Sequence, residues 1–231
     1  MKSILLRIKN PDNSLLPYEH NYTLSIAIYN KLQYYQDSVR KLHTKEIQDI
    51  HTISTIIPQN PEYETAGINF QKGFFILRSY YDDIIDHLRL AISLDGTLKV
   101  GDLYLEVTGI KDTDEPSFNS GDINFRTLSP VLVRDHEDRK TFRTHTDDVP
   151  ENLSLSMSWS FSSFTSKSVE KPTITIASLK RKTVRVSKSG TILGAVVLRG
   201  SIQGDPDLLR FSYYKGLGSK TGLGLGCWEV G

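Results

Sequence analysis

The chain has 231 residues, a formal net charge of +1, 38% apolar residues and 24% charged residues, which is typical of a globular protein rather than a disordered or fibrous one. Its apolar runs are far shorter than the roughly 20 residues needed to span a membrane. Its single cysteine, Cys227, excludes an intramolecular disulfide and a cysteine zinc cluster. We therefore expect a cytoplasmic protein with no membrane partner.

Hydrophobic periodicity predicts a mixture of strands and helices. In chain order it predicts a strand over 3–8, a helix over 21–36, a strand over 74–77, a helix over 81–94, strands over 103–110, 128–133, 173–177, 183–186 and 191–198, a helix over 205–214 and a last strand over 222–230. Asp205 is expected to cap the third helix, with Pro206 in its first turn. The segment 151–165 stays ambiguous, because its many serines weaken a helix prediction.

The order of these elements suggests two similar halves. The first half runs strand, helix, strand region, strand, helix, strand, and the second half, from about residue 123, repeats that pattern. This is the split ferredoxin-like plan. We therefore predict an α+β fold of two tandem ferredoxin-like (RRM-like) domains, 1–122 and 123–231, joined by the acidic, Pro-, Ser- and Gly-containing stretch 112–122.

The near-neutral total charge hides an uneven distribution. Between Ser79 and Asn124 there are ten acidic and three basic residues, whereas between Lys167 and Arg199 there are eight basic residues and one acidic residue. Long-range fields follow local clustering, so the second half could face a polyanion. On composition alone, a solvated basic surface is the favoured alternative.

The most distinctive segment is the glycine-rich stretch 215–226, Lys-Gly-Leu-Gly-Ser-Lys-Thr-Gly-Leu-Gly-Leu-Gly. Glycine lets a ligand approach backbone amides without a Cβ in the way, and successive amides can form an anion site. The spacing does not match a Walker A loop, and the stretch follows a helix instead of preceding one, which excludes a dinucleotide fingerprint. The glycines by themselves leave a tight structural turn and a phosphate-binding loop equally open.

The full form of this stretch, Gly-Leu-Gly, five residues containing a lysine, then Gly-Leu-Gly, resembles the C-terminal signature of the repeat-associated RNA-binding proteins of CRISPR systems. Within them it looks most like the Cas6 (Cas-six) endoribonucleases, which cut precursor CRISPR RNA within each repeat. Shorter matching pieces lie in the same order along the chain, namely Pro17-Tyr18-Glu19-His20, Ile28-Tyr29-Asn30 and Thr127-Leu128-Ser129-Pro130. Two ferredoxin-like domains are also what this resemblance implies.

The resemblance implies metal-independent cleavage without a cofactor, in which the ribose 2′-hydroxyl attacks the adjacent phosphate and leaves a 2′,3′-cyclic phosphate and a 5′-hydroxyl. It implies Tyr29 as a positioning donor and His43 as the general acid or base. At 100° per residue Tyr29 falls off the apolar stripe of its helix, which agrees with a position facing a cleft. From the residues alone, packing or surface roles are the favoured alternatives for both.

The third catalytic position departs from the family, because Asp49 stands where members often carry a lysine. Lys45 could supply the cation instead, and His51 could serve as a second proton carrier. Taken singly, a solvated surface role is the favoured alternative for each. His20, before the first helix, is expected to cap or pack.

Further RNA contacts are expected from the glycine-rich stretch, through Gly216, Gly218, Lys220, Gly222, Gly224 and Gly226, and from a predicted hairpin carrying Lys180, Arg181, Lys182 and Arg185. Four aromatic residues near the glycines could stack on bases, although core packing is favoured for at least two, and these are Phe211, Tyr213, Tyr214 and Trp228.

The expected partner is CRISPR repeat RNA, with effector-complex proteins and a second copy of the chain as further candidates. Two other functions stay open. One is a non-cleaving RNA-binding subunit of a CRISPR effector complex, and the other is an unrelated ferredoxin-like protein that binds a small anion.

Overall fold

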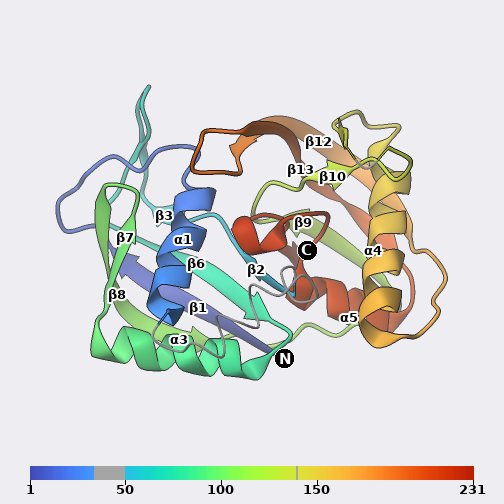
Figure 1. The fold of residues 1–231 in the computed structure, drawn as a ribbon, viewed down its shortest axis with the longest axis horizontal. Helices are drawn as coiled ribbons and strands as arrows, with labels where there is room; N and C mark the ends of the chain where they lie inside the picture. The colour runs from blue at the N-terminus through green and yellow to red at the C-terminus, as the bar shows by residue number, and fades with distance from the viewer. Residues whose placement is uncertain (34–49, 139) are drawn as a thin grey trace.

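The computed structural model describes residues 1–33, 50–138 and 140–231. Its architecture consists of two antiparallel sheets that lie side by side, with the longer helices packed on the face of the sheets that is turned toward the viewer in Figure 1. We call the residues up to Asp112 the first unit and those from Asp122 onward the second unit. No strand of the described chain is shared between the two sheets.

The first unit has a sheet in the order β2-β6-β1-β8-β7, with β3 also paired to β6. Its strands are β1 Lys2–Lys9, β2 His51–Ile53, β3 Ile57–Gln59, β6 Lys72–Ser79, β7 Thr97–Val100 and β8 Leu103–Asp112, its helices are α1 Asn21–Leu32 and α3 Asp82–Leu94, and a small hairpin is formed by β4 Glu62–Tyr63 and β5 Ile68–Asn69.

Buried and exposed side chains alternate along β1. Ile4, Leu6 and Ile8 are almost fully buried on the face toward the helices, whereas Arg7 and Lys9 are exposed. Because side chains point to opposite faces of a strand in turn, this pattern covers one face of the sheet and leaves the other accessible. The helices complete the core with the apolar stripes that their sequences predict.

The second unit has a four-stranded sheet in the order β12-β13-β9-β14. Its strands are β9 Asp122–Thr127, β12 Thr173–Arg185, β13 Ile192–Gln203 and β14 Trp228–Val230, its helices are α4 Val149–Thr165 and α5 Pro206–Lys215, a short hairpin is formed by β10 Val133–Arg134 and β11 Phe142–Arg143, and a 3₁₀ turn η1 covers Thr221–Leu223.

The two units share one topology. In the first unit the four main strands lie side by side as β8-β1-β6-β2, and in the second unit as β14-β9-β13-β12. Numbered within each unit, both orders are fourth, first, third, second, with one helix after the first strand and another after the third. The predicted α+β class with two tandem ferredoxin-like units is therefore confirmed.

Four predicted strands differ from the structure in position or extent. The strand expected over 128–133 lies earlier, over β9, because Pro130 has no N–H to give to a central ladder. The strands expected over 173–177 and 183–186 form one continuous strand, β12, with an irregularity between Ile176 and Ser178. The last strand is shorter than expected and begins only at Trp228.

The helix predictions were more accurate. Asp205 caps α5, and its side chain accepts hydrogen bonds from the amides of Asp207 at 2.8 Å and Leu208 at 3.2 Å. The ambiguous serine-rich segment is a helix, α4, with Pro150 in its first turn. Tertiary packing of its apolar stripe outweighs the weak helix propensity of serine. In the described part of the chain no helix has the length and apolarity to cross a membrane.

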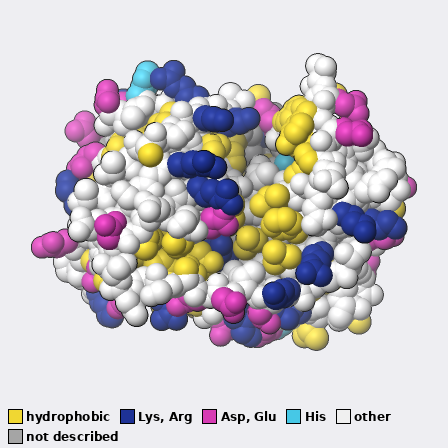
Figure 2. Space-filling view, turned by 180° about the vertical axis from the view of Figure 1, so that it is seen from behind, with side chains coloured by type: hydrophobic (Ala, Val, Ile, Leu, Met, Phe, Trp, Pro, Cys, Tyr) yellow, Lys and Arg dark blue, Asp and Glu magenta, His cyan; other side chains and the backbone are white. Residues whose placement is uncertain are grey.

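The opposite side of the molecule is shown in Figure 2. Lys and Arg side chains gather in the upper middle of this view, and hydrophobic side chains lie on either side of the midline below them. The cations on this face are therefore unevenly distributed.

Candidate active-site groove between the two units

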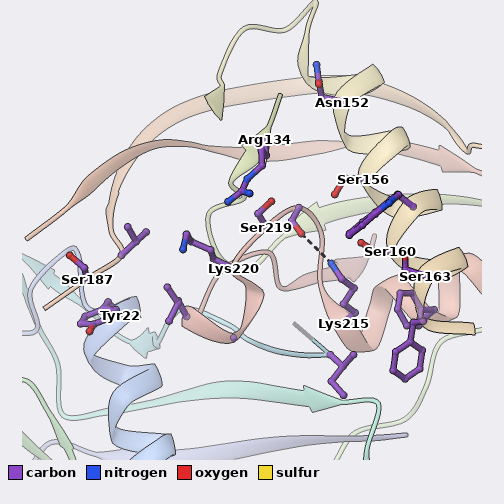
Figure 3. Close-up of a pocket in the computed structure, with 18 of the residues that line it drawn as sticks. Tyr22, Arg134, Asn152, Ser156, Ser160, Ser163, Ser187, Lys215, Ser219 and Lys220 are labelled. Carbon is purple, nitrogen blue, oxygen red and sulfur yellow. Dashed lines mark hydrogen bonds between the residues drawn. The ribbon is translucent and has the colours of Figure 1, made fainter. Parts of the chain in front are cut away.

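A groove of about 1240 Å³ runs between α1 of the first unit and α4 of the second, with the glycine-rich stretch and α5 at its base. Figure 3 shows side chains from both helices and from the glycine-rich stretch pointing into it. We call the groove-lining residues of α1 the α1 wall and those of α4 the α4 wall. A space of this size between two units is a natural place for a ligand.

The α1 wall brings together two residues that the sequence singled out. The Tyr29 hydroxyl and His51 Nε2 are 3.2 Å apart, and the two rings meet edge to face with centroids 5.7 Å apart. Tyr29 lines the groove, whereas His51, on β2, is only 2% exposed. His51 is therefore placed to orient the Tyr29 hydroxyl instead of reaching a ligand itself.

The predicted catalytic residues His43 and Lys45 lie outside the described residues, as does Asp49. Their roles therefore stay predictions.

His20 is a buried packing residue beneath the α1 wall. Its Nδ1 is 2.7 Å from the Pro17 carbonyl oxygen, and its Nε2 is 3.1 Å from the Ile56 amide nitrogen. A carbonyl can only accept and an amide N–H can only donate, so the neutral ring carries its proton on Nδ1. Burial lowers the pKa of His20 to about 4.

The glycine-rich stretch forms the seam between the units. The Asn21 side-chain amide donates to the Gly224 carbonyl at 2.7 Å, and the Thr52 hydroxyl donates to the Leu225 carbonyl at 2.9 Å. Gly224 has a φ of +77°, and a Cβ there would come within 2.7 Å of the Asn21 carbonyl oxygen. Glycine is needed here for both its backbone conformation and its small size.

Several backbone amides of the glycine-rich stretch donate hydrogen bonds to carbonyl groups of the protein itself. The Gly216 amide donates to Ser212 at 2.8 Å, the Gly224 amide to Thr221 at 3.2 Å and the Gly226 amide to Pro130 at 2.8 Å. These three amides are not available to a phosphate, which corrects the prediction that these glycines bind RNA through their backbone. Gly218, Lys220 and Gly222 make none of these bonds and line the groove, so the prediction stays for them.

The groove carries positive charge at its base. Lys215 is buried and donates to the Gly218 carbonyl at 3.2 Å, while Lys220 is half-buried. Arg134 from β10 also points into the groove beside Ser219 and Lys220 (Figure 3). The neighbouring Asp135 does not neutralise it, because that carboxylate forms its ion pair with Arg143.

The charge of Asp135 is itself stabilised locally. A hydrogen bond from the Asp138 amide, followed by the bond from Arg143, holds the pKa of Asp135 below its usual value. Asp135 therefore stays ionised and paired at neutral pH.

The four basic residues expected at a hairpin lie on β12, the first strand of the antiparallel β12–β13 hairpin. Arg181 donates to the Thr144 carbonyl at 3.2 Å, and Arg185 to the Lys188 carbonyl at 2.8 Å, so these two cations are already engaged. Lys180 and Lys182 are exposed, and their side chains have no hydrogen bond or ion pair with other described residues. RNA binding by these two lysines stays a prediction.

The four aromatic residues proposed for base stacking are core residues. Phe211, Tyr213 and Tyr214 are 3–4% exposed, and Trp228 is fully buried. The Tyr214 hydroxyl donates to Glu115 at 2.6 Å, and burial is the main cause that raises the pKa of Tyr214. Core packing, favoured for at least two of them, is confirmed for all four, because they form the interior of the second unit and are not available to stack on bases.

Sequence reasoning missed two groove residues, Arg134 and Trp159. Trp159 is 59% exposed on α4, although a tryptophan in a serine-rich helix would ordinarily be assigned to the core. A signal was available, since Trp159 is two positions from both Met157 and Phe161 and therefore faces away from their stripe. No local pattern marked Arg134.

The architecture defines the class first: a protein of two tandem ferredoxin-like units with a charged groove between them. The model of the family described as "CRISPR associated protein Cas6, C-terminal" matches residues 113–230, which is half of the chain. The chain therefore belongs to the Cas6 family of CRISPR-associated proteins. This membership excludes the alternative of an unrelated small-anion-binding protein.

Relatives with similar lengths agree with this assignment. The chain is 27% identical over 230 residues to a CRISPR-associated endoribonuclease-like protein, Cas6nc, of Pyrococcus horikoshii, covering 93% of each chain. It is 23% identical to the CRISPR-associated endoribonuclease Cas6 1 of Methanocaldococcus jannaschii, covering 96% of this chain and 90% of the relative.

A solved structure shares the fold over the whole chain. It is described as an RAMP protein binding different RNA substrates, and it superposes with a TM-score of 0.86 at 23% identity, covering 100% of this chain and 99% of the other.

Proposed function

We propose that this protein is a metal-independent endoribonuclease that cuts precursor CRISPR RNA within its repeats and releases CRISPR RNA. The groove between the units is the observation that supports this most strongly. The Tyr29 hydroxyl, which His51 holds, lines this groove together with Lys220 and Arg134. The relatives named as CRISPR-associated endoribonucleases support RNA as the substrate.

Cleavage without a metal uses the ribose 2′-hydroxyl as an internal nucleophile, already tethered beside the phosphate. Its oxygen forms a bond to phosphorus while the bond from phosphorus to the 5′-oxygen breaks. The products are a 2′,3′-cyclic phosphate and a 5′-hydroxyl. A base must accept the 2′ proton, and an acid must supply a proton to the leaving 5′-oxygen.

We assign His43 to one of these proton transfers and Tyr29 to positioning the reacting phosphate. We assign Lys45 to the charge that develops on phosphorus. His51 acts through Tyr29, because its own side chain is buried below the groove surface. Cations around a transferring phosphoryl group stabilise its charge more effectively in a groove than in water.

The proposal is tested with purified protein and its own repeat RNA in excess EDTA. We expect one cut within the repeat and a cyclic phosphate on the upstream product. Replacing His43 (His43→Ala) should slow the cut by about 100-fold or more, since one proton transfer contributes roughly 10² to 10⁴. Lys45→Ala should slow it less. Undiminished cutting by His43→Ala would remove that residue from the mechanism.

A second candidate function is RNA binding without cleavage, as a subunit of a CRISPR effector complex. Asp49, where family members often carry a lysine, favours this candidate. Tight binding of repeat RNA by the native protein, with no product in EDTA or in Mg²⁺, would establish it in place of the nuclease.

A further inference from the structure

The two walls of the groove present their residues at one shared helical spacing. Taking the first residue of each stripe as a starting point, the others follow four, seven, eight and eleven positions later, an arrangement that places all five on one face of a helix. The α1 wall consists of Tyr22, Ile26, Tyr29 and Asn30, with the C-cap residue Gln33 added to it, and the α4 wall contains Asn152, Ser156, Trp159, Ser160 and Ser163. Trp159 therefore occupies in the second unit the position that Tyr29 occupies in the first.

Trp159 is unusually exposed for its size. It is 59% exposed, whereas Leu153, Met157 and Phe161 on the same helix are buried in the core of the second unit. A tryptophan ring can bury roughly 150–250 Å² of surface, so leaving it in a groove forgoes a large favourable contribution to folding. An aromatic face of this kind, beside cations, is suited to stacking on an unpaired base.

The α4 wall also offers hydrogen-bonding groups that the fold does not use. Ser158, outside the wall, donates back to the Ser154 carbonyl at 3.2 Å, as serines within helices often do. By contrast, the hydroxyls of Ser156 and Ser160 make no hydrogen bond with any other described residue, and both residues line the groove. Figure 3 shows their hydroxyl oxygens on the side of α4 that faces Arg134 and the glycine-rich stretch.

Arg134 has no ion pair with any described carboxylate. Its Nε is buried and has no hydrogen-bond partner among the described residues, and its guanidinium lies 5.7 Å from the centre of the Phe142 ring. The side chain points into the groove in Figure 3, and a phosphate oxygen is a favourable acceptor for the terminal nitrogens of a guanidinium. Lys220, below Arg134 in Figure 3, adds a second positive charge.

We propose that the α4 wall is a subsite for one unpaired nucleotide of the RNA. Its base stacks on Trp159 and receives hydrogen bonds from Ser156 and Ser160, while an adjacent phosphate is held by Arg134 and Lys220. This inference rests on the proposed function, because it takes single-stranded RNA as the ligand. Serine hydroxyls both donate and accept hydrogen bonds, so they discriminate little between the four bases. We therefore expect the subsite to require that the nucleotide is unpaired and to show little preference for its base.

The chain allows a direct optical test, because it has two tryptophans and Trp228 is fully buried. Fluorescence changes on RNA binding should therefore report on Trp159. The probes are the protein's own repeat RNA and short single-stranded homopolymers of adenylate, uridylate and cytidylate. We expect each RNA to quench the fluorescence of the native protein, and Trp159→Phe to lose most of the quenching while keeping its affinity.

Affinity is measured in parallel by a method that does not use tryptophan. Trp159→Ala should bind RNA about 10-fold to 100-fold more weakly, the effect expected for losing one stacked base. Arg134→Gln should lower the slope of log affinity against log salt by about 0.7, the value for one phosphate contact to a single strand. Tyr63→Ala, at a 70% exposed tyrosine on β4, is the matched control and should change neither quantity.

The outcomes separate this inference from the proposed function. If the native protein cuts repeat RNA but Trp159→Ala binds as tightly as the native protein and no quenching occurs, the subsite is wrong and the nuclease stands. If RNA quenches Trp159 and Trp159→Ala binds weakly but no RNA is cut, the subsite stands and the nuclease falls. Absence of both binding and cleavage overturns both.

Discussion

Helices α1 and α4 hold equivalent places in the two units, each following the first strand of its sheet and each lining one side of the groove. The α1 wall carries Tyr29, whose hydroxyl is bound to a buried histidine of a neighbouring strand. The α4 wall carries Trp159 beside Ser156 and Ser160, whose hydroxyls make no hydrogen bond within the described protein. The same topology thus presents a tyrosine hydroxyl held by a buried histidine on one side and an exposed tryptophan ring on the other.

This difference suggests that the α1 wall serves the reaction and the α4 wall serves RNA binding. A group that acts in a reaction must be held in one orientation, which requires partners within the protein. A group that recognises a ligand must instead leave its hydrogen bonds and its ring face available. Variants in the α1 wall should therefore change the rate of cleavage, and variants in the α4 wall should change RNA affinity.

The largest expected effect is a loss of stability at the contact between the glycine-rich stretch and α1. In Gly224→Ala a Cβ would meet the backbone of Asn21 at 2.7 Å, in a conformation with positive φ. Backbone strain and overpacking together should cost about 2–5 kcal/mol of unfolding free energy. Denaturant unfolding measures this loss.

Gly190→Ala is the matched control for this experiment, because Gly190 also has a positive φ, +88°, but nothing lies within 4 Å of its Cβ position. It should cost only about 1–2 kcal/mol from backbone strain. Equal losses in the two variants would show that close contact between the glycine-rich stretch and α1 contributes nothing to stability.

A smaller effect is expected from His20, which lies beneath the α1 wall. Its pKa is about 4 in the folded protein, below the 6.5 of an exposed histidine, so protonation favours the unfolded chain. This contribution to stability is complete above pH 6.5 and is lost as the pH falls toward 4, by about 3 kcal/mol in total. Unfolding measured across this range should show the loss.

His20→Gln removes the titrating group and is the comparison for this measurement. The dependence of its stability on pH between 6.5 and 4 should be flatter than that of the native protein. Parallel curves for the two proteins would mean that His20 titrates normally and is not held neutral by burial.

The smallest expected effect is the loss of cleavage rate when the Tyr29 hydroxyl is removed. Tyr29→Phe should lower kcat about 10-fold to 100-fold with little change in KM, because the hydroxyl acts on the reacting phosphate more than on binding. His51→Gln should give a similar loss. The double variant should lose less than the sum of the two, since both changes remove one interaction.

Tyr22→Phe provides the control, because it removes another tyrosine hydroxyl from the same wall. Single-turnover cleavage of repeat RNA measures all four variants. A fall in kcat for Tyr22→Phe as large as that for Tyr29→Phe, or fully additive losses at Tyr29 and His51, would contradict a specific role for the pair.

The contrast between the walls could be predicted only in part. Apolar spacing identified α1 and placed Tyr29 away from the core, and the aspartate-proline pair at 205–206 identified the start of α5. The same approach left α4 undecided, because helix propensity is a local quantity whereas α4 is stabilised by packing on its sheet. The pairing of Tyr29 with His51 was not visible, since these residues come from different elements 22 positions apart.

The sequence by itself determined the class of fold, the family signature at residues 216–226 and the candidate tyrosine and histidines, because periodicity and short motifs are properties of neighbouring residues. Tertiary structure alone decided which glycine amides are engaged, that the aromatic residues of α5 are buried, and that Arg134 and Trp159 line the groove opposite Tyr29. The reason is that burial and hydrogen-bond satisfaction depend on which distant segments meet, and the packing of the two units against each other fixes those contacts.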